Sequence, residues 1–142
     1  MILQELFREN EEVITLSPQA RMSDAAELMR RESIGSIVIV DETEIVGIIT
    51  DRDIGLSLAL TAATPDSFVN EVMSRDVETI YDSMTLFEAA RCFKKAHVKR
   101  LPVVNQNKQL VGIVSTDDVI AMLSRELHDT CTTLEYKHEH LV

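Results

Sequence analysis

The sequence predicts a mixed α/β (α+β) fold, in which two copies of a β-α-β-β-α unit pack through their sheets about a pseudo-twofold axis. A seven-residue phrase occurs twice, as "GIITDRD" from Gly47 and as "GIVSTDD" from Gly112. Around each phrase, runs of β-branched residues alternate with segments of helical periodicity. The chain has 142 residues, and half of such a chain is too short to bury both faces of its own sheet.

The repeat extends well beyond the phrase. Aligning Val13 with Val77, a shift of 64, brings "VITLSP" over "VETIYD" and "SIVIVD" over "RLPVVN". One extra residue in the second turn raises the shift to 65, at which "IVGIITDRDI" overlies "LVGIVSTDDV". The predicted parts are a first repeat (8–62), a crossover linker (63–76), a second repeat (77–126) and a polar C-terminal tail (127–142).

Each copy is expected to begin with a short strand and a helix. Residues 13–16 form a β-rich run at the start of the first copy. The following segment places Ala25, Leu28 and Met29 at i, i+3, i+4 spacing, which predicts a helix with one buried face. The aligned residues of the second copy are Ala89, Cys92 and Phe93.

Each copy is expected to end with a hairpin and a second helix. Runs of β-branched residues at 36–40 and 45–50 flank the polar "DETE", and "NQNK" takes its place in the second copy. Helical periodicity resumes after the third strand of each copy, with an apolar side made of Ile54, Leu58, Val119, Ile120 and Leu123. Pro65 and several turn formers in "TAATPDSFVNEVMSRD" indicate a surface crossover between the copies.

Composition excludes several classes of protein. The 24 acidic and 14 basic residues give a formal net charge of −10, which would repel a phosphate backbone, so no nucleic-acid partner is expected. No apolar run approaches the ~18–20 residues needed to cross a bilayer, and the N-terminus has no signal-peptide pattern. We therefore expect no membrane association and a cytoplasmic protein. Cys92 and Cys131 lack disulfide or zinc spacing, which indicates free thiols, with Cys92 in the core.

The two units resemble a tandem pair of CBS domains, the family named after cystathionine β-synthase. The resemblance rests on "GIITDRDI" and "GIVSTDDV" at the end of each third strand, "HVKRLPVV" in the second copy and "VNEVMSRDV" between the copies. It covers about residues 10–125. It implies the fold described above and a regulatory module that binds an adenosine compound.

Two interpretations of the Gly-x-x-Thr/Ser-x-x-Asp motif compete at 47–53 and 112–118. A hydroxyl followed three residues later by an acid, just before an apolar helix, fits a capping box, and the glycine would allow close packing. A hydroxyl and free N–H groups at a helix N-terminus also suit a phosphate, and a carboxylate suits the hydroxyls of a ribose. The resemblance favours the ligand role, and both roles can coexist.

The resemblance implies two clefts, each combining the motif of one copy with the strands of the other. In the first cleft, Val98 would contact the adenine while Lys99 and Arg100 reach the phosphates. The alternative for "KKAHVKR" is a solvated basic face at a helix end, which we favour for Lys94 and Lys95. The residues expected in the first cleft are Thr50, Arg52, Asp53, Thr79, Val98, Lys99 and Arg100.

The second cleft lacks this basic pair. Without Lys or Arg, and with Asp117 beside it, the cleft is expected to take a ligand of little negative charge, such as adenosine or S-adenosylmethionine, or to stay empty. The residues expected there are Thr15, Ile34, Gly35, Ser36, Ser115 and Asp118.

These features predict an adenosine-nucleotide sensor and not an enzyme. No Ser-His-acid or Cys-His set stands out, and His97 fits a surface position as well as the edge of a cleft. The expected ligands are AMP, ADP or ATP, and less so S-adenosylmethionine or NAD, with no obligatory cofactor. No metal is expected, because His138 and His140 lie on a polar tail where solvation is the usual state.

Regulatory output requires contact with another protein. A homodimer and an unidentified regulated partner are expected, with the dimer formed through helix residues Leu56, Leu60, Ile120, Met122 and Leu123. The alternative is that these residues serve only the internal core. The apolar "MILQELF" is expected to pack on the body or on a partner. The alternative function is a ligand-free structural dimerisation or protein-interaction module.

Overall fold

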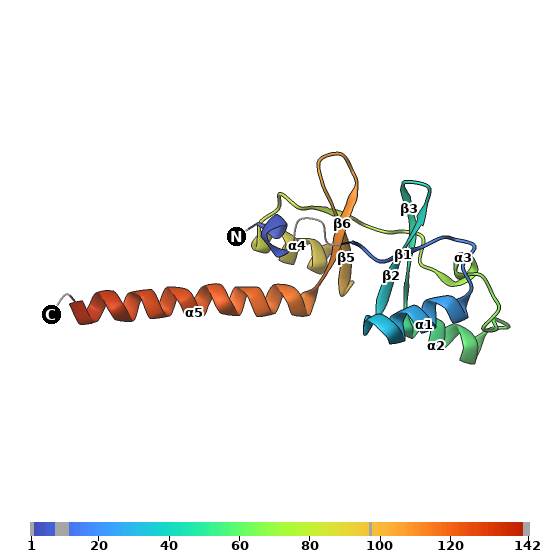
Figure 1. The fold of residues 1–142 in the computed structure, drawn as a ribbon. Helices are drawn as coiled ribbons and strands as arrows, with labels where there is room; N and C mark the ends of the chain where they lie inside the picture. The colour runs from blue at the N-terminus through green and yellow to red at the C-terminus, as the bar shows by residue number, and fades with distance from the viewer. Residues whose placement is uncertain (1, 8–11, 97, 141–142) are drawn as a thin grey trace.

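The two repeats form two separate three-stranded sheets, each with its own helices (Figure 1). The computed structural model describes residues 2–7, 12–96 and 98–140, with side chains described as far as residue 134. The first repeat contains β1 (Thr15–Leu16), α1 (Met22–Glu32), β2 (Ser36–Asp41), β3 (Glu44–Thr50) and α2 (Asp51–Leu60). The second contains β4 (Ile80–Tyr81), α4 (Leu86–Ala96), β5 (Arg100–Val104), β6 (Leu110–Ser115) and α5 (Thr116–His140). The predicted β-α-β-β-α order is confirmed for both copies.

The sheets repeat each other down to the register of their strands. In each sheet the middle strand pairs in parallel with a two-residue strand and antiparallel with the next strand along the chain. The register places Ser36 opposite Thr50 in one sheet and Arg100 opposite Ser115 in the other. Each motif hydroxyl therefore lies directly beside the first residue of the middle strand of its own repeat.

Both faces of each middle strand are covered. Successive side chains of a strand point to opposite faces, yet every residue from Ser36 to Ile39 in β2 is buried. Ile37 and Ile39 belong to the core of the first repeat, whereas Val38, also fully buried, lies on the other face. Pro102 of β5 has the same position relative to the core of the second repeat. Figure 1 shows the two sheets side by side with the helices outside them, as expected for repeats packed through their sheets.

The short helical turns that precede β1 and β4 are exchanged between the repeats. The N-terminal 3₁₀ turn η1 (Leu3–Leu6) buries Leu3 in the core of the second repeat, and α3 (Val69–Val72) buries Val69 in the core of the first. Matching hydrogen bonds hold the two turns. The Leu3 N–H donates to the Met84 carbonyl at 2.9 Å, and the Val69 N–H donates to the Ala20 carbonyl at 2.8 Å.

The glycine of each motif makes room for a side chain from one of these turns. A Cβ added to Gly112 would overlap the ring of Phe7, and a Cβ added to Gly47 would overlap the Sδ and Cγ atoms of Met73. The segments "LQELF" and "VNEVM" are therefore equivalent, at a shift of 66. The apolar N-terminal segment, expected on the body or on a partner, packs on the second repeat of its own chain.

Both motifs also form capping boxes. The Asp53 N–H donates to the Thr50 hydroxyl at 3.1 Å, and the Thr50 N–H donates to a carboxylate oxygen of Asp53 at 3.0 Å. Ser115 and Asp118 make the same pair of bonds at the start of α5, at 3.1 and 2.9 Å. The capping interpretation of the motif is thus confirmed in both copies, and it explains why α2 and α5 begin where they do.

The last helix differs from its counterpart in the first repeat. α2 ends at Leu60, whereas α5 continues as one helix through residues 127–140 and projects beyond the body of the molecule (Figure 1). Ile120 and Leu127 are more than 60% exposed on this helix, while Met122 is buried and Leu123 is half-buried against the core. The alternative of an internal core role therefore holds for Met122 and Leu123.

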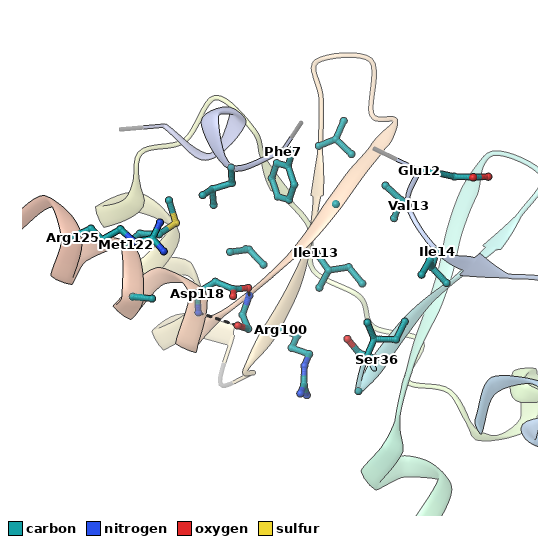
Figure 2. Close-up of a pocket in the computed structure, with 18 residues that line it drawn as sticks. Phe7, Glu12, Val13, Ile14, Ser36, Arg100, Ile113, Asp118, Met122 and Arg125 are labelled. Atoms are coloured by element: carbon teal, nitrogen blue, oxygen red, sulfur yellow. Dashed lines mark hydrogen bonds between the residues drawn. The ribbon is translucent and has the colours of Figure 1, made fainter. Parts of the chain in front are cut away.

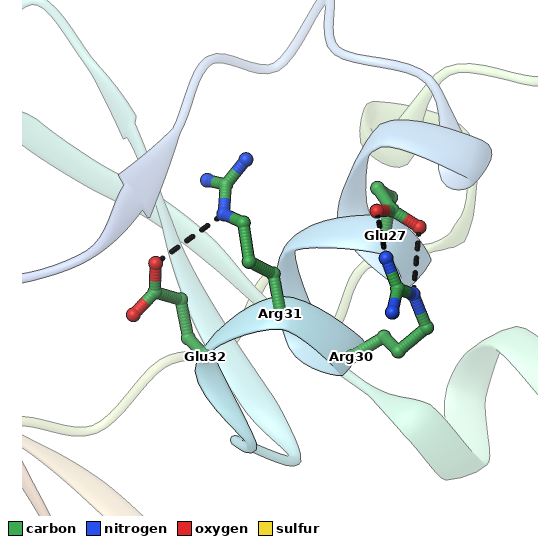
Figure 3. Close-up of polar contacts among 4 residues, drawn as sticks. All are labelled: Glu27, Arg30, Arg31 and Glu32. Carbon is green, nitrogen blue, oxygen red and sulfur yellow. Dashed lines mark hydrogen bonds and ion pairs between the residues drawn. The ribbon is translucent and has the colours of Figure 1, made fainter.

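Polar contacts on the outer face of α1 lie in solvent (Figure 3). Arg30 forms a two-pronged hydrogen bond with Glu27, and Arg31 donates to Glu32 at 3.4 Å. The Arg30 hydrogen bond and charge hold the pKa of Glu27 below its ordinary value. Since all four side chains are exposed, these pairs contribute little to stability.

None of the helices in the described part of the chain is both long and apolar enough to span a membrane.

Replacing either motif glycine by alanine should destabilise the protein. We expect Gly47→Ala and Gly112→Ala each to lower the free energy of unfolding by about 1–3 kcal/mol, because the new methyl group overlaps a packed side chain. Gly55→Ala is the matched control, since it lies in α2 with open space around it and should gain up to about 1 kcal/mol of helix propensity. Urea unfolding measures all three; equal stabilities at positions 47 and 55 would contradict the packing argument.

Loss of a cap should have a smaller effect. Thr50→Ala and Ser115→Ala each remove one side-chain acceptor for a helix N–H and should cost about 1 kcal/mol in the same measurement. Ser124→Ala, exposed within α5, should instead add about 0.5 kcal/mol. A loss at Ser124 as large as at Ser115 would show that the cap is not the cause.

Candidate functional site

A cavity of about 600 Å³ lies where the two repeats meet (Figure 2). Its size is within the usual range for small-molecule sites. The first repeat contributes Ile34, Gly35 and Ser36 from the start of β2, together with Val13 and Ile14 before β1. The second repeat contributes β6 and the first turns of α5, and the N-terminal turn adds Leu6 and Phe7.

The cavity has a polar end and an apolar end. Figure 2 shows Asp118 and Arg100 at one end and Phe7 at the other, with Ile113 between them. Leu6 and Val111 lie with Phe7 among the lining residues. A molecule with a flat apolar part and a charged part matches this distribution better than a uniformly polar or uniformly apolar one.

The sequence-predicted second cleft corresponds to this cavity. Ile34, Gly35, Ser36, Ser115 and Asp118 all line it. Thr15, also expected there, is exposed on β1 and is not among the lining residues; Val13 and Ile14 line the cavity instead. These two precede the paired part of the strand, since only Thr15 and Leu16 pair with β2.

Asp118 retains binding capacity despite its role as a cap. One carboxylate oxygen, Oδ2, accepts from the Ser115 N–H. A carboxylate has two oxygens and about four acceptor sites, so Asp118, which is exposed, can also accept from hydroxyl groups of a ligand. The Ser115 hydroxyl accepts from the Asp118 N–H and still has its own proton to donate.

The expectation that this cleft holds no Lys or Arg is wrong. Arg100 and Arg125 both line the cavity. Arg100 was expected in the first cleft, but the strand register places it opposite Ser115 of its own repeat. Arg125 follows Asp118 by seven residues, two helical turns, and therefore lies on the same face of α5. That i, i+7 spacing is the signal by which Arg125 could have been found in the sequence.

Arg100 also approaches the first repeat. A Cβ built on Gly35 would lie 3.1 Å from Nη2 of Arg100 and 3.3 Å from Oδ2 of Asp51. The Asp51 N–H donates to the Gly35 carbonyl at 3.1 Å. An arginine from the second repeat and a carboxylate from the first thus both approach Gly35, where a larger side chain would not fit.

The remaining residues of the predicted first cleft lie at the start of α2, just before β4 and just before β5. Thr50 and Asp53 cap α2, Asp53 half-buried, while Arg52, Val98 and Lys99 are exposed. Thr79 lines a second hollow of about 690 Å³ near the hairpin tips, with Glu44, Tyr81 and Lys108 among its neighbours. Neither of the two cavities described here is lined by Thr50, Arg52, Asp53, Val98 or Lys99.

The histidines and cysteines singled out in the sequence lie apart from this cavity or outside the described residues. Among the residues that the structure describes, no three His, Cys, Asp or Glu side chains are grouped as metal ligands. His97, and the side chains of His138 and His140, lie outside the described part. Cys92 is half-buried at the edge of the core of the second repeat, as expected, and both cysteines are free thiols.

Comparison with known proteins agrees with this architecture. Residues 5–55 and 69–125 match the CBS domain. The CBS domain-containing protein YhcV of Bacillus subtilis is 31% identical over 131 residues, which cover 91% of this chain and 93% of YhcV. The uncharacterized protein MK0525 of Methanopyrus kandleri is 37% identical over 111 residues, and the match covers 77% of this chain but only 57% of that protein.

A solved structure shows the same arrangement. The CBS domain pair of protein MJ0100, crystallised with 5′-methylthioadenosine and S-adenosyl-L-methionine, superposes with a TM-score of 0.77 at 26% identity, over 89% of this chain and 98% of that one. The resemblance and the fold expected from the sequence are confirmed. The chain belongs to the CBS-domain family and carries two copies of the domain.

Proposed function

We propose that the protein is a regulatory module that binds an adenosine nucleotide in the cavity between its repeats. The observation that carries the proposal is the convergence, in one cavity of about 600 Å³, of the Ser115–Asp118 motif, the start of β2 and two arginines. Each has a matching part in a nucleotide: Asp118 for the ribose hydroxyls, Arg100 and Arg125 for a phosphate, and the apolar end for the base.

Two guanidinium groups in the lining favour a phosphorylated ligand. Arg100 and Arg125 can each pair with a phosphate, while Asp118 and Glu12 bring the formal charge of the lining residues to zero. AMP, ADP and ATP are therefore preferred over neutral adenosine, with S-adenosylmethionine and NAD as further candidates. The MJ0100 pair, with its two adenosine-containing ligands, supports the class of ligand.

Binding would act on a partner and not through catalysis. Exposed apolar side chains on α2 and α5, including Leu56, Leu60 and Ile120, provide surface for a homodimer or for a regulated protein. These exposed side chains also favour the second candidate function, a protein-interaction module that works without a ligand. Ligand binding separates the two candidates.

Nucleotide binding should stabilise the protein measurably. At 100 times its Kd, AMP should add about 2.7 kcal/mol to the free energy of unfolding, which corresponds to a Tm increase on the order of 8 °C for a chain of this size. A thermal-shift series with adenosine, AMP, ADP, ATP, S-adenosylmethionine and NAD measures the effect. No shift with any of them would leave the interaction module as the better account.

Charge-removing variants test which cavity is used. Arg100→Gln and Arg125→Gln should each weaken AMP by about tenfold or more and adenosine much less, because only AMP carries the phosphate. Asp118→Asn should weaken both ligands. Lys94→Gln, on the exposed face of α4, removes the same charge away from the cavity and should change neither. If Lys94→Gln and Arg125→Gln raised the Kd for AMP equally, the effect would come from the overall charge of the protein and not from a contact in the cavity.

Homodimer formation should depend on the exposed helix residues. Leu60→Glu and Ile120→Glu place a charge on side chains that are 76% and 61% exposed in the single chain, so their cost should fall on the dimer and not on the fold. Light scattering after size exclusion should show a dimer for the wild type and for Thr43→Glu, at an exposed hairpin position, and a monomer for the helix variants. A wild-type monomer would exclude the dimer.

A further inference from the structure

Phe7 lines the cavity from a segment that neither motif includes. Its ring lies against Gly112 in β6, at the one position in that strand where no Cβ intervenes. The residue is only half-buried, so part of the ring remains available to a molecule in the cavity. Figure 2 shows the ring at the opposite end of the cavity from Arg100 and Asp118.

An adenosine phosphate has the same order of parts as the cavity. Its phosphate and ribose match Arg100, Arg125 and Asp118, and its base would then lie toward the apolar end, beside Phe7. Phe7 is the one aromatic side chain among the residues that line this cavity. Aromatic rings bind nucleobases by stacking, a contact that every base can make through its flat face.

We propose that Phe7 is the base-contacting residue of this cleft, so that the N-terminal turn supplies one wall of the binding site. This inference rests on the proposed function and adds a residue that binds the base. The turn is already held in place without ligand: the Leu3 N–H donates to Met84 and the Gln4 N–H donates to Asp82, at 2.9 and 2.8 Å.

The pseudosymmetry of the chain supplies a matched control. Met73 packs on Gly47 as Phe7 packs on Gly112 and is buried in the core of the first repeat, but it is not among the residues that line the cavity. Truncating either side chain removes packing over a motif glycine. Only the truncation of Phe7 removes a contact with the base.

The experiment is isothermal titration calorimetry of the 142-residue chain with AMP, adenosine and ribose 5-phosphate, which lacks the base. Phe7→Ala should raise the Kd for AMP and for adenosine by about 5- to 150-fold, the range expected for loss of one stacked ring, and leave the Kd for ribose 5-phosphate unchanged. Phe7→Trp should retain AMP binding. Met73→Ala should lower Tm and leave all three Kd values within about twofold of the wild type.

The outcomes are distinguishable. If the wild type binds AMP and Phe7→Ala binds it equally well or more tightly, the role of Phe7 is overturned while the proposed function stands. If the wild type binds no adenosine compound, both the proposed function and the role of Phe7 fail.

Should Phe7→Ala be too unstable for titration, Phe7→Leu keeps an apolar side chain over Gly112 without a ring. It should show the same selective loss for AMP and adenosine, and unchanged AMP binding by Phe7→Leu would equally overturn the inference.

Discussion

The helices of each repeat cover only one face of its own sheet, and the rest of the structure depends on this constraint. Val38 in one sheet and Pro102 in the other are fully buried on the face opposite their own core, so the inner face of each three-stranded sheet, which faces away from its own helices, needs a neighbour. When the two repeats pack through these faces, each sheet buries the open face of the other. The cavity draws its residues from both repeats.

Exchange of the leading turns adds a second connection between the repeats. Leu3 completes the core of the second repeat, and Val69 completes the core of the first. The motif glycines are part of the same device, because Phe7 and Met73 can lie over the strands only where a Cβ is missing. The phrase repeated in the sequence thus encodes a close approach at the glycine and a helix cap in both copies, and in the second copy it also places the Asp118 carboxylate in the lining of the cavity.

Much of this could be predicted from the sequence, and the failures have physical causes. Strand and hairpin positions follow from local periodicity, so the hairpin turns were predictable. The capping boxes at Thr50 and Ser115 were predictable because each hydroxyl is followed three residues later by an acid. Aligning the repeats shows which residues are equivalent but not toward which cleft each one points. Arg100 was expected in the first cleft, whereas it lines the second and also approaches Gly35 of the first repeat. Phe7 was missed because its turn is shifted by 66 residues instead of 64, and Arg125 because it lies two helical turns beyond the motif.

The length of α5 has a mechanical consequence. The helix begins one residue after Ser115 and runs for 25 residues, which at 1.5 Å per residue is about 37 Å. Its first turns line the cavity, and its far end lies well clear of the body. A rigid rod pivoted at one end magnifies small rotations: a tilt of about 5° at the cavity moves the distal tip by about 3 Å, roughly the diameter of a water molecule. The length of α5 would therefore amplify a small movement at the cavity into a larger displacement at its far end.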